Sequence, residues 1–170
     1  MSELTLKLLC DTREPWPHPW AEFLPDNCGL ERATLETGDW CVAGQADGIV
    51  IERKTASDFL GTITAGRDRW ERELRRARLD CRELIVVVEA SFAVVNAKRG
   101  MMSEESLIGT VAGLARRGVP VVFAGGIEAA ARIAFAALLQ PVKSMDKKLR
   151  SVSWHARRKA IVEVGKGGEE

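Results

Sequence analysis

The sequence predicts an α/β protein with a mixed, mainly parallel central sheet that carries helices on both faces. Two observations lead to this prediction. Segments with strand patterns alternate with segments of helical periodicity in the order β-α-β-β-α-β-α-β-α, which is typical of sheets joined by crossover helices. In addition, residues 84–88 and 120–124 form continuous apolar runs, as expected of strands that are covered on both faces.

Length and composition indicate one compact globular domain. The 170 residues are 46% hydrophobic and 29% charged, close to globular averages, and a chain of this size buries a core without disulfides. The four cysteines form no C-x-x-C pair, so a zinc knuckle or redox motif is not indicated and we expect reduced thiols. The start of the chain has no basic segment followed by an apolar run, so we expect a cytoplasmic protein.

The first half of the chain contains three expected strands. Residues 4–10 alternate between apolar and polar side chains and run directly into an acidic segment that begins at Asp11. Prolines follow, so we expect an extended loop and then a short helix over 20–24. Residues 32–35 and 48–52 flank a turn-rich segment, and we expect them to pair as an antiparallel hairpin.

The second half contains three helical patterns. Apolar positions at spacings of three, four and seven begin after Thr55 and continue to Ala77, with Gly66 as an expected kink. Further helices are expected over 103–117 and 127–139. In the first, Ser103 is the expected N-cap and Gly118 the expected C-terminal stop. The two apolar runs lie between these helices, which completes the alternation.

Charge is unevenly distributed, although the net charge is only +1. Residues 1–60 hold eleven acids and five bases and can bind cations, whereas residues 66–78 hold six arginines and three acids and can bind phosphates. Residues 143–170 hold eight bases and four acids. We therefore expect a domain over 1–141, followed over 142–170 by a basic C-terminal tail that is disordered rather than a dedicated DNA-binding arm.

Asp39, Glu52 and Lys54 are predicted to lie together and suit phosphodiester hydrolysis. Side chains alternate between the faces of a strand, so Glu52 and Lys54 project to one side while Arg53 projects to the other. Asp39 lies beside them at the neighbouring strand of the expected hairpin. Two carboxylates suit Mg²⁺, which keeps several waters. Lys54 could orient or deprotonate the attacking water, or offset developing charge, and the pattern does not choose among these roles.

Five strings occur in one order along the chain: Asp11-Thr12-Arg13-Glu14, Leu35-x-x-Gly38-Asp39-Trp40, Val50-Ile51-Glu52-Arg53-Lys54-x-x-x-Asp58, Gly66-Arg67 and Val86-Val87-Val88-Glu89. Together they resemble the nuclease domain of the XPF family, whose mark is G-D followed by E-R-K-x-x-x-D, within the restriction-endonuclease-like PD-(D/E)XK superfamily. The resemblance covers Leu4 to Leu139. Nothing in the sequence resembles a helix-hairpin-helix or helicase domain, so the chain is most similar to compact bacterial or phage forms.

The resemblance implies a structure-selective DNA endonuclease that cuts near single-strand/double-strand junctions or flaps, uses Mg²⁺ or Mn²⁺ and forms a homodimer. By motif position it implies a set of active-site residues, namely Asp11, Asp39, Glu52, Lys54 and Asp58. Of these, Asp39, Glu52 and Asp11 are the expected metal ligands. The expected DNA contacts are Arg13, Arg53 and Arg67, and further candidates are Glu14, Glu71 and Glu89.

Several of these residues also suit a structural role. The string T-x-x-D that ends at Asp58 resembles a capping box, so capping and catalysis are equally supported there. For Arg53, an ion pair or a phosphate contact is favoured over direct chemistry. Glu89 ends a buried strand, where an acid is either solvated or in contact with the active site. Trp16 and Trp20 could stack on unpaired bases, although packing of the proline-rich loop is favoured.

Two other functions stay open alongside the junction or flap endonuclease. The first is a general PD-(D/E)XK nuclease of resolvase or restriction type. The second is a non-catalytic DNA-binding partner that keeps the fold, which is disfavoured because every charged position of the G-D…E-R-K-x-x-x-D pattern is present. In either enzyme, the apolar segments 103–117 and 127–139 are candidates for a homodimer interface.

Overall fold

The computed structural model of the chain describes the backbone of residues 6–151 and the side chains of residues 6–140. The chain divides into two compact units, Met1–Leu138 and Leu139–Glu170, and the sheet and the residues discussed below belong to the first. Most of the C-terminal tail expected over 142–170 therefore lies outside the described residues. Within those residues, no helix is long and apolar enough to cross a membrane.

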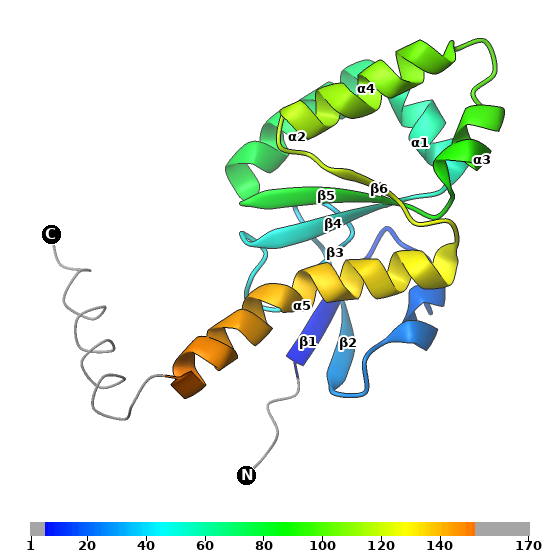
Figure 1. Cartoon of the computed structure of the whole chain (residues 1–170). Coiled ribbons are helices and arrows are strands. Elements are labelled where there is room, and N and C mark those ends of the chain that lie inside the picture. The colour runs from blue at the N-terminus through cyan, green and yellow to red at the C-terminus, as the bar shows by residue number, and fades with distance from the viewer. Residues whose placement is uncertain (1–5, 152–170) are drawn as a thin grey trace, which may run out of the picture. The chain divides into compact units, whose positions relative to one another are not determined.

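A six-stranded sheet forms the centre of the described fold (Figure 1). Its strands are β1 (Leu6–Asp11), β2 (Cys28–Ala33), β3 (Trp40–Val42), β4 (Ile49–Lys54), β5 (Glu83–Val88) and β6 (Val121–Phe123). They lie in the order β2-β1-β3-β4-β5-β6, and only the two pairs that involve β3 are antiparallel. The mixed, mainly parallel sheet predicted from the sequence is confirmed.

Helices cover both faces of this sheet, as expected. They are the 3-10 helix η1 (Pro19–Phe23) and the α-helices α1 (Ala56–Ile63), α2 (Arg67–Asp80), α3 (Phe92–Ala97), α4 (Glu104–Arg116) and α5 (Ile127–Ser151). In Figure 1, α1 to α4 lie on one side of the sheet, and η1 and the first part of α5 lie on the other. The helical pattern expected after Thr55 is thus split into α1 and α2 near the expected kink.

Each face of the sheet has its own hydrophobic core. On one face, Val86 of β5 packs in a cluster with Phe59 of α1 and Leu114 of α4. On the other face, the rings of Trp40 and Phe135 lie 5.4 Å apart at their centroids, and Trp20 of η1 stacks on Trp40. Because both faces are buried, the alternation of side chains along β4 and β5 decides which core each residue enters.

The hairpin expected between residues 32–35 and 48–52 is wrong. Strand β2 pairs in parallel with β1, and the antiparallel partner of β4 is β3, with Trp40 opposite Ile51. The sequence did not indicate β3 because its three residues are all buried and too few to show an alternation. Pairing between distant segments is decided by packing, which a local pattern does not report.

Two further elements differ from expectation. Helix α3 was not predicted, since its six residues are too few to establish a helical period. Helix α5 continues past Leu139, where we expected it to end before Pro141. A proline removes one backbone hydrogen bond and disfavours a helix, but it does not by itself terminate one when the remaining bonds persist.

Candidate active site

The residues Asp39, Glu52 and Lys54 meet in a cleft of about 290 Å³ between the end of β4, the loop before β3 and helix α2. Trp70 and Glu73 of α2 form part of its wall. The cleft lies on the face of the sheet that carries α1 and α2. The three residues that the sequence predicted to lie together do so, and helix α2 forms a further wall of their cleft.

Asp39 is held by a tight turn in front of β3. Gly38 has φ +69°, and a Cβ atom there would clash with Cγ1 of Val50, so only glycine fits this position. The Asp39 N–H donates to the carbonyl of Ile51 over 2.8 Å, and the Arg53 N–H donates to Oδ2 of Asp39 over 2.8 Å. Among the described residues, Oδ1 has no hydrogen-bond partner. One oxygen thus remains available in the cleft.

Glu52 and Lys54 occupy alternate positions of β4 and project to the same face, as expected. The Lys54 Nζ lies 2.7 Å from Oε1 of Glu52, and the two side chains are 16% and 15% exposed. The ammonium also lies over the Trp70 ring, 5.2 Å from its centroid. The second oxygen of Glu52 has no hydrogen-bond partner within the described part of the chain. The lysine is therefore held against the carboxylate and an aromatic face.

The cleft contains more buried negative charge than its cations offset. Burial, reinforced by the nearby charges of Glu52 and Glu14, raises the pKa of Asp39 well above its usual value. Burial also raises the pKa of Glu52, against the opposing effect of Lys54. Burial alone would lower the pKa of Lys54, but the charge and hydrogen bond of Glu52, together with the charges of Asp39 and Glu73, outweigh burial and raise that pKa. A cation would relieve this repulsion.

The donor set fits a hydrated hard cation. Asp39 and Glu52 offer carboxylate oxygens, the ligands that Mg²⁺ and Mn²⁺ prefer, and each has one oxygen without a hydrogen-bond partner among the described residues. Within residues 6–140 no group of three or more acidic, histidine or cysteine side chains is placed to enclose a metal ion. Mg²⁺ does not need such an enclosure, because it binds through one or two carboxylates and retains its waters.

Asp11, the third expected metal ligand, lies buried at the end of β1 with both oxygens engaged. Its carboxylate accepts hydrogen bonds from the backbone and side chain of Arg13 and from the Leu35 N–H, the last over 2.7 Å. Burial raises the pKa of Asp11, but these hydrogen bonds outweigh it and hold the pKa below its usual value. The geometry supports a structural role in the loop. Arg13, by contrast, lines the cleft.

Asp58 lies at the first turn of α1 on the rim of the cleft. The Thr55 hydroxyl accepts from the Asp58 N–H over 3.2 Å and donates to Oδ2 of Asp58 over 2.7 Å, so a helix cap is present. The side chain also lines the cleft and is exposed to solvent. The cap that the sequence suggested is therefore formed, and it leaves the other carboxylate oxygen able to act in the cleft.

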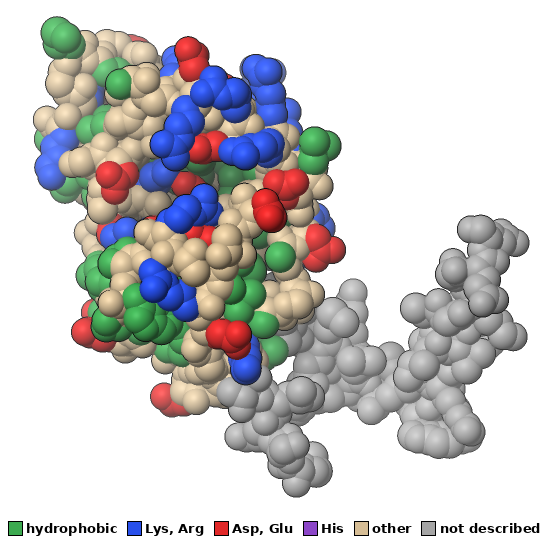
Figure 2. Space-filling view, turned by 180° about the vertical axis from the view of Figure 1, so that it is seen from behind, with side chains coloured by type: hydrophobic (Ala, Val, Ile, Leu, Met, Phe, Trp, Pro, Cys, Tyr) green, Lys and Arg blue, Asp and Glu red, His purple; other side chains and the backbone are tan. Residues whose placement is uncertain are grey.

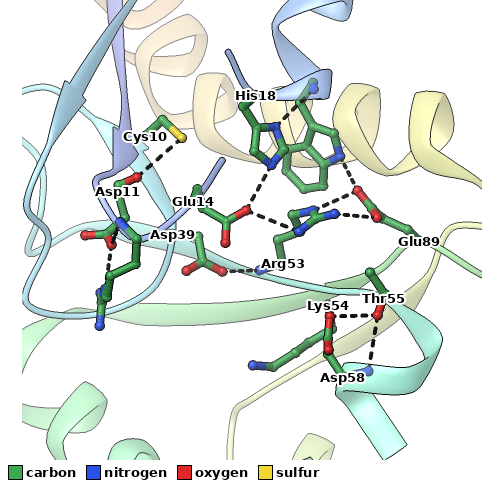
Figure 3. A network of polar contacts seen from close by, with 12 residues as sticks. Cys10, Asp11, Glu14, His18, Asp39, Arg53, Lys54, Thr55, Asp58 and Glu89 are labelled. Atoms are coloured by element: carbon green, nitrogen blue, oxygen red, sulfur yellow. Dashed lines mark hydrogen bonds and ion pairs between the residues drawn. The ribbon is translucent and has the colours of Figure 1, made fainter. Parts of the chain in front are cut away.

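Arg53 points to the opposite face of β4, into a network of ion pairs (Figure 3). Its guanidinium donates to both oxygens of Glu89 over 2.8 and 2.9 Å, and to Glu14 over 3.2 Å. Glu14 also accepts from His18, and Trp20 donates to Glu89 over 2.7 Å. The His18 bond and the Arg53 charge outweigh burial and lower the pKa of Glu14. Every charge in this network has a partner.

Arg67 and Glu71 lie away from the cleft, in a second cavity of about 410 Å³ between α2 and α4. Glu71 forms an ion pair with Arg117 over 2.6 Å. Arg67 and Arg116 line the same cavity, and neither forms an ion pair with any described residue. Figure 2 shows the face on which Lys and Arg side chains gather over the upper half of the molecule. This cavity can accept an anionic group.

Glu73 is a site residue that the sequence did not single out. It lines the cleft beside Trp70 and forms an ion pair with the exposed Arg69 over 2.8 Å. A usable signal was present, because Glu73 lies three residues after Trp70 and four before Ala77, both of which are buried. This spacing places all three on adjacent positions of one helix face. The charge pattern of α2 obscured that signal.

Comparisons with known proteins agree with this architecture. A family model described as the ERCC4 domain matches residues 10–136. XPF from Aeropyrum pernix has a similar fold, with TM-score 0.61 and 23% identity over 78% of this chain and 59% of that chain. XPF from Aeropyrum pernix in complex with DNA has TM-score 0.56 and 19% identity over 93% of this chain and 73% of that chain. The first alignment thus spans less than two thirds of the XPF chain.

A search of curated proteins found no significant match. The family model nevertheless covers most of the chain, including the strings around Asp39 and Glu52, and the two solved structures share the fold. The chain belongs to the ERCC4 domain family.

Proposed function

We propose that the protein is a metal-dependent DNA endonuclease that hydrolyses phosphodiester bonds at single-strand/double-strand junctions or flaps. The observation that carries this proposal is the cleft in which Asp39, Glu52 and Lys54 meet with unbalanced buried negative charge. Perturbed carboxylates beside a charged amine in a cleft are the usual physical sign of a catalytic site. Family membership supports the same conclusion.

The carboxylates and the lysine of the cleft have different proposed roles in the reaction. Asp39 and Glu52 would hold the cation, while the Arg53 N–H and the Lys54 ammonium fix one oxygen of each carboxylate. A bound Mg²⁺ or Mn²⁺ ion would supply charge neutralisation at the phosphate and a more acidic water. Lys54, whose ammonium lies 2.7 Å from Oε1 of Glu52, is proposed as a donor that stabilises charge developing on the phosphate.

DNA is the proposed substrate because cationic side chains lie around the site. One of the similar XPF structures is a complex with DNA, which supports the same substrate class here. Arg13 lies at the cleft, and Arg67 and Arg116 line the second cavity, with Trp70 forming a wall of both. Two adjoining sites for phosphates suit DNA whose strands diverge, so we propose selectivity for branched DNA.

A cleavage assay with defined DNA substrates tests this function. Flap, splayed-arm, four-way and plain duplex DNAs are incubated with the protein in Mg²⁺, with EDTA as the control. We expect cleavage of the flap or splayed arm that EDTA abolishes. Equal cleavage of plain duplex would favour a restriction-type nuclease, preference for the four-way junction would favour a resolvase, and binding without cleavage would favour a non-catalytic partner.

We further propose that the protein forms a homodimer through the apolar side chains left on its surface. Ile108 of α4 is 50% exposed, and Ile127 and Ile133 of α5 are 39% and 38% exposed. Large apolar side chains that are exposed on these helices are candidates for burial in an interface. Sedimentation equilibrium should give the mass of two chains at tens of micromolar, an amount well above the roughly micromolar affinity of a weak interface. A monomer at that concentration would contradict the proposal.

A further inference from the structure

We infer that Glu73 of α2 is a cation-binding residue of the cleft, acting through water on the same ion as Asp39 and Glu52. The inference rests on the proposed function and deepens it. It assigns the wall formed by α2 a part in holding the hydrated ion, in addition to the two carboxylates expected from the sequence. It also separates Glu73 from the other acids of α2, which the sequence alone does not distinguish.

The first argument is the position of Glu73 across the cleft from the strand residues. Glu73 and Trp70 come from α2, while Glu52 and Lys54 come from the end of β4, and all four line one cavity. The charge of Glu73 acts on both Glu52 and Lys54, so the three groups are electrostatic neighbours. Glu73 therefore lines the same space as the two β4 residues.

The second argument is that the ion pair with Arg69 does not explain why Glu73 lies at the cleft. Its partner Arg69 has a side chain that is 79% exposed, while the Glu73 side chain is 30% exposed. An exposed pair at this helical spacing stabilises a helix only weakly. Glu73 adds a further negative charge to the cleft that Glu52 and Asp39 line. A cation in the cleft turns the same charge into a favourable contact.

The third argument concerns how Glu73 would reach the ion. Among the described residues, the acids of the cleft are not placed as a three-ligand enclosure, so Glu73 is not a direct third ligand. Mg²⁺ retains several waters when two carboxylates hold it, and those waters are strong hydrogen-bond donors. Glu73 can accept from them across the cleft. Arg69 can release Glu73 into this role, because its exposed guanidinium is readily solvated.

Calorimetric titration of the full chain with Mn²⁺, without DNA, tests the inference. Glu73→Gln keeps the shape and a hydrogen-bonding oxygen but removes the charge, and we expect Mn²⁺ binding to weaken about five- to tenfold. Asp68→Asn is the matched control, because it removes one charge from an exposed position of the same helix that lines neither cavity. That variant should bind Mn²⁺ within about twofold of the wild type.

A second variant distinguishes binding from a merely structural role. Arg69→Gln breaks the ion pair but leaves the charge of Glu73, so Mn²⁺ binding should tighten about two- to threefold. The same change in a Glu73→Gln background should have no such effect, because the interaction runs through Glu73. If Arg69→Gln weakens binding, or acts equally in both backgrounds, Glu73 serves the fold and the inference is wrong.

Failure of this inference is distinguishable from failure of the proposed function. Asp39→Asn should abolish saturable Mn²⁺ binding. If it does so while Glu73→Gln binds like the wild type, the cation site stands and only the role of Glu73 is refuted. If Asp39→Asn binds Mn²⁺ as the wild type does, or the wild type binds none, the metal site of the proposed function is itself refuted.

Discussion

The end of β4 carries buried charged side chains on both of its faces, and the two faces differ in how far protein partners offset those charges. On one side, Arg53 is enclosed by Glu14 and Glu89, and each oxygen that it contacts lies within hydrogen-bonding distance. On the other side, Glu52 and Asp39 repel each other, and burial raises the pKa of both. The two environments differ although residues 52 and 53 are neighbours in the chain. A buried charge alone does not identify a functional site.

The difference lies in whether the protein supplies the counter-charge. The Arg53 side resembles a closed structural ion network, in which removal of one member leaves a buried charge without a partner. On the cleft side, burial raises the pKa of both carboxylates, and a ligand of positive charge would offset their repulsion. Surplus charge that the protein itself does not satisfy is therefore the better guide to function. Four predictions test this contrast.

The largest expected effect is the loss of cleavage on neutralising a cleft carboxylate. Asp39→Asn or Glu52→Gln should lower the rate of DNA cleavage on the order of 10³-fold or more, because each removes a charge that holds the cation. Without divalent ions, neither variant should be less stable than the wild type, since each relieves repulsion. Single-turnover cleavage and urea denaturation measure the two effects. Cleavage at near wild-type rate would show that the site is wrongly assigned.

The second effect is a loss of stability on the other side of the strand. Arg53→Met should lower the free energy of unfolding by about 3 kcal/mol, because it leaves Glu89 and Glu14 buried without their counter-charge. Urea denaturation in EDTA measures this. The comparison with Glu52→Gln under the same conditions is decisive. If the two variants are equally destabilised, the contrast between the two sides of β4 does not hold.

The third effect separates chemistry from binding at Lys54. Lys54→Ala should reduce single-turnover cleavage in Mg²⁺ on the order of 10²-fold, as expected for a group that stabilises charge in the transition state. Affinity for DNA, measured by anisotropy in Ca²⁺, should fall only slightly because many phosphate contacts share the binding.

Arg75→Ala is the control for Lys54, since this arginine is exposed on α2 and lines neither cavity. It should at most weaken DNA binding and leave cleavage at saturating protein unchanged. Should Lys54→Ala instead lose affinity and cleavage in equal proportion, the lysine is a phosphate clamp and its catalytic assignment fails.

The smallest effect is a pH dependence of stability in EDTA. The pKa values of Asp39 and Glu52 are raised by folding, so the folded state binds more protons and stability falls as pH rises from about 4 towards the raised values. Glu14 has a lowered pKa, so its contribution has the opposite sign and is lost as pH falls through the folded pKa.

The difference in unfolding free energy between wild type and Asp39→Asn isolates the first contribution. As pH rises, the wild type should lose stability relative to Asp39→Asn. Adding Mn²⁺ should restore the stability of the wild type, because the ion offsets the repulsion. Urea denaturation at several pH values measures it. A pH-independent difference would mean that Asp39 ionises normally in the folded protein.

The sequence by itself determined the features that follow from local geometry. The alternation of side chains along a strand placed Glu52 and Lys54 on one face and Arg53 on the other, and the structure agrees. The cap at Asp58 and the fold class were predictable for the same reason. A strand has a period of two and a helix a period of 3.6, so a short stretch of sequence already contains the information.

Only the tertiary structure decided which partners meet across long distances in the chain. It placed Glu89 against Arg53, 36 residues away, and engaged both oxygens of Asp11 through Arg13 and Leu35. It also turned Glu73 towards the cleft. These outcomes depend on how strands pair and how α2 packs on them, and the free energy that selects one packing is spread over the whole core rather than carried by any local motif.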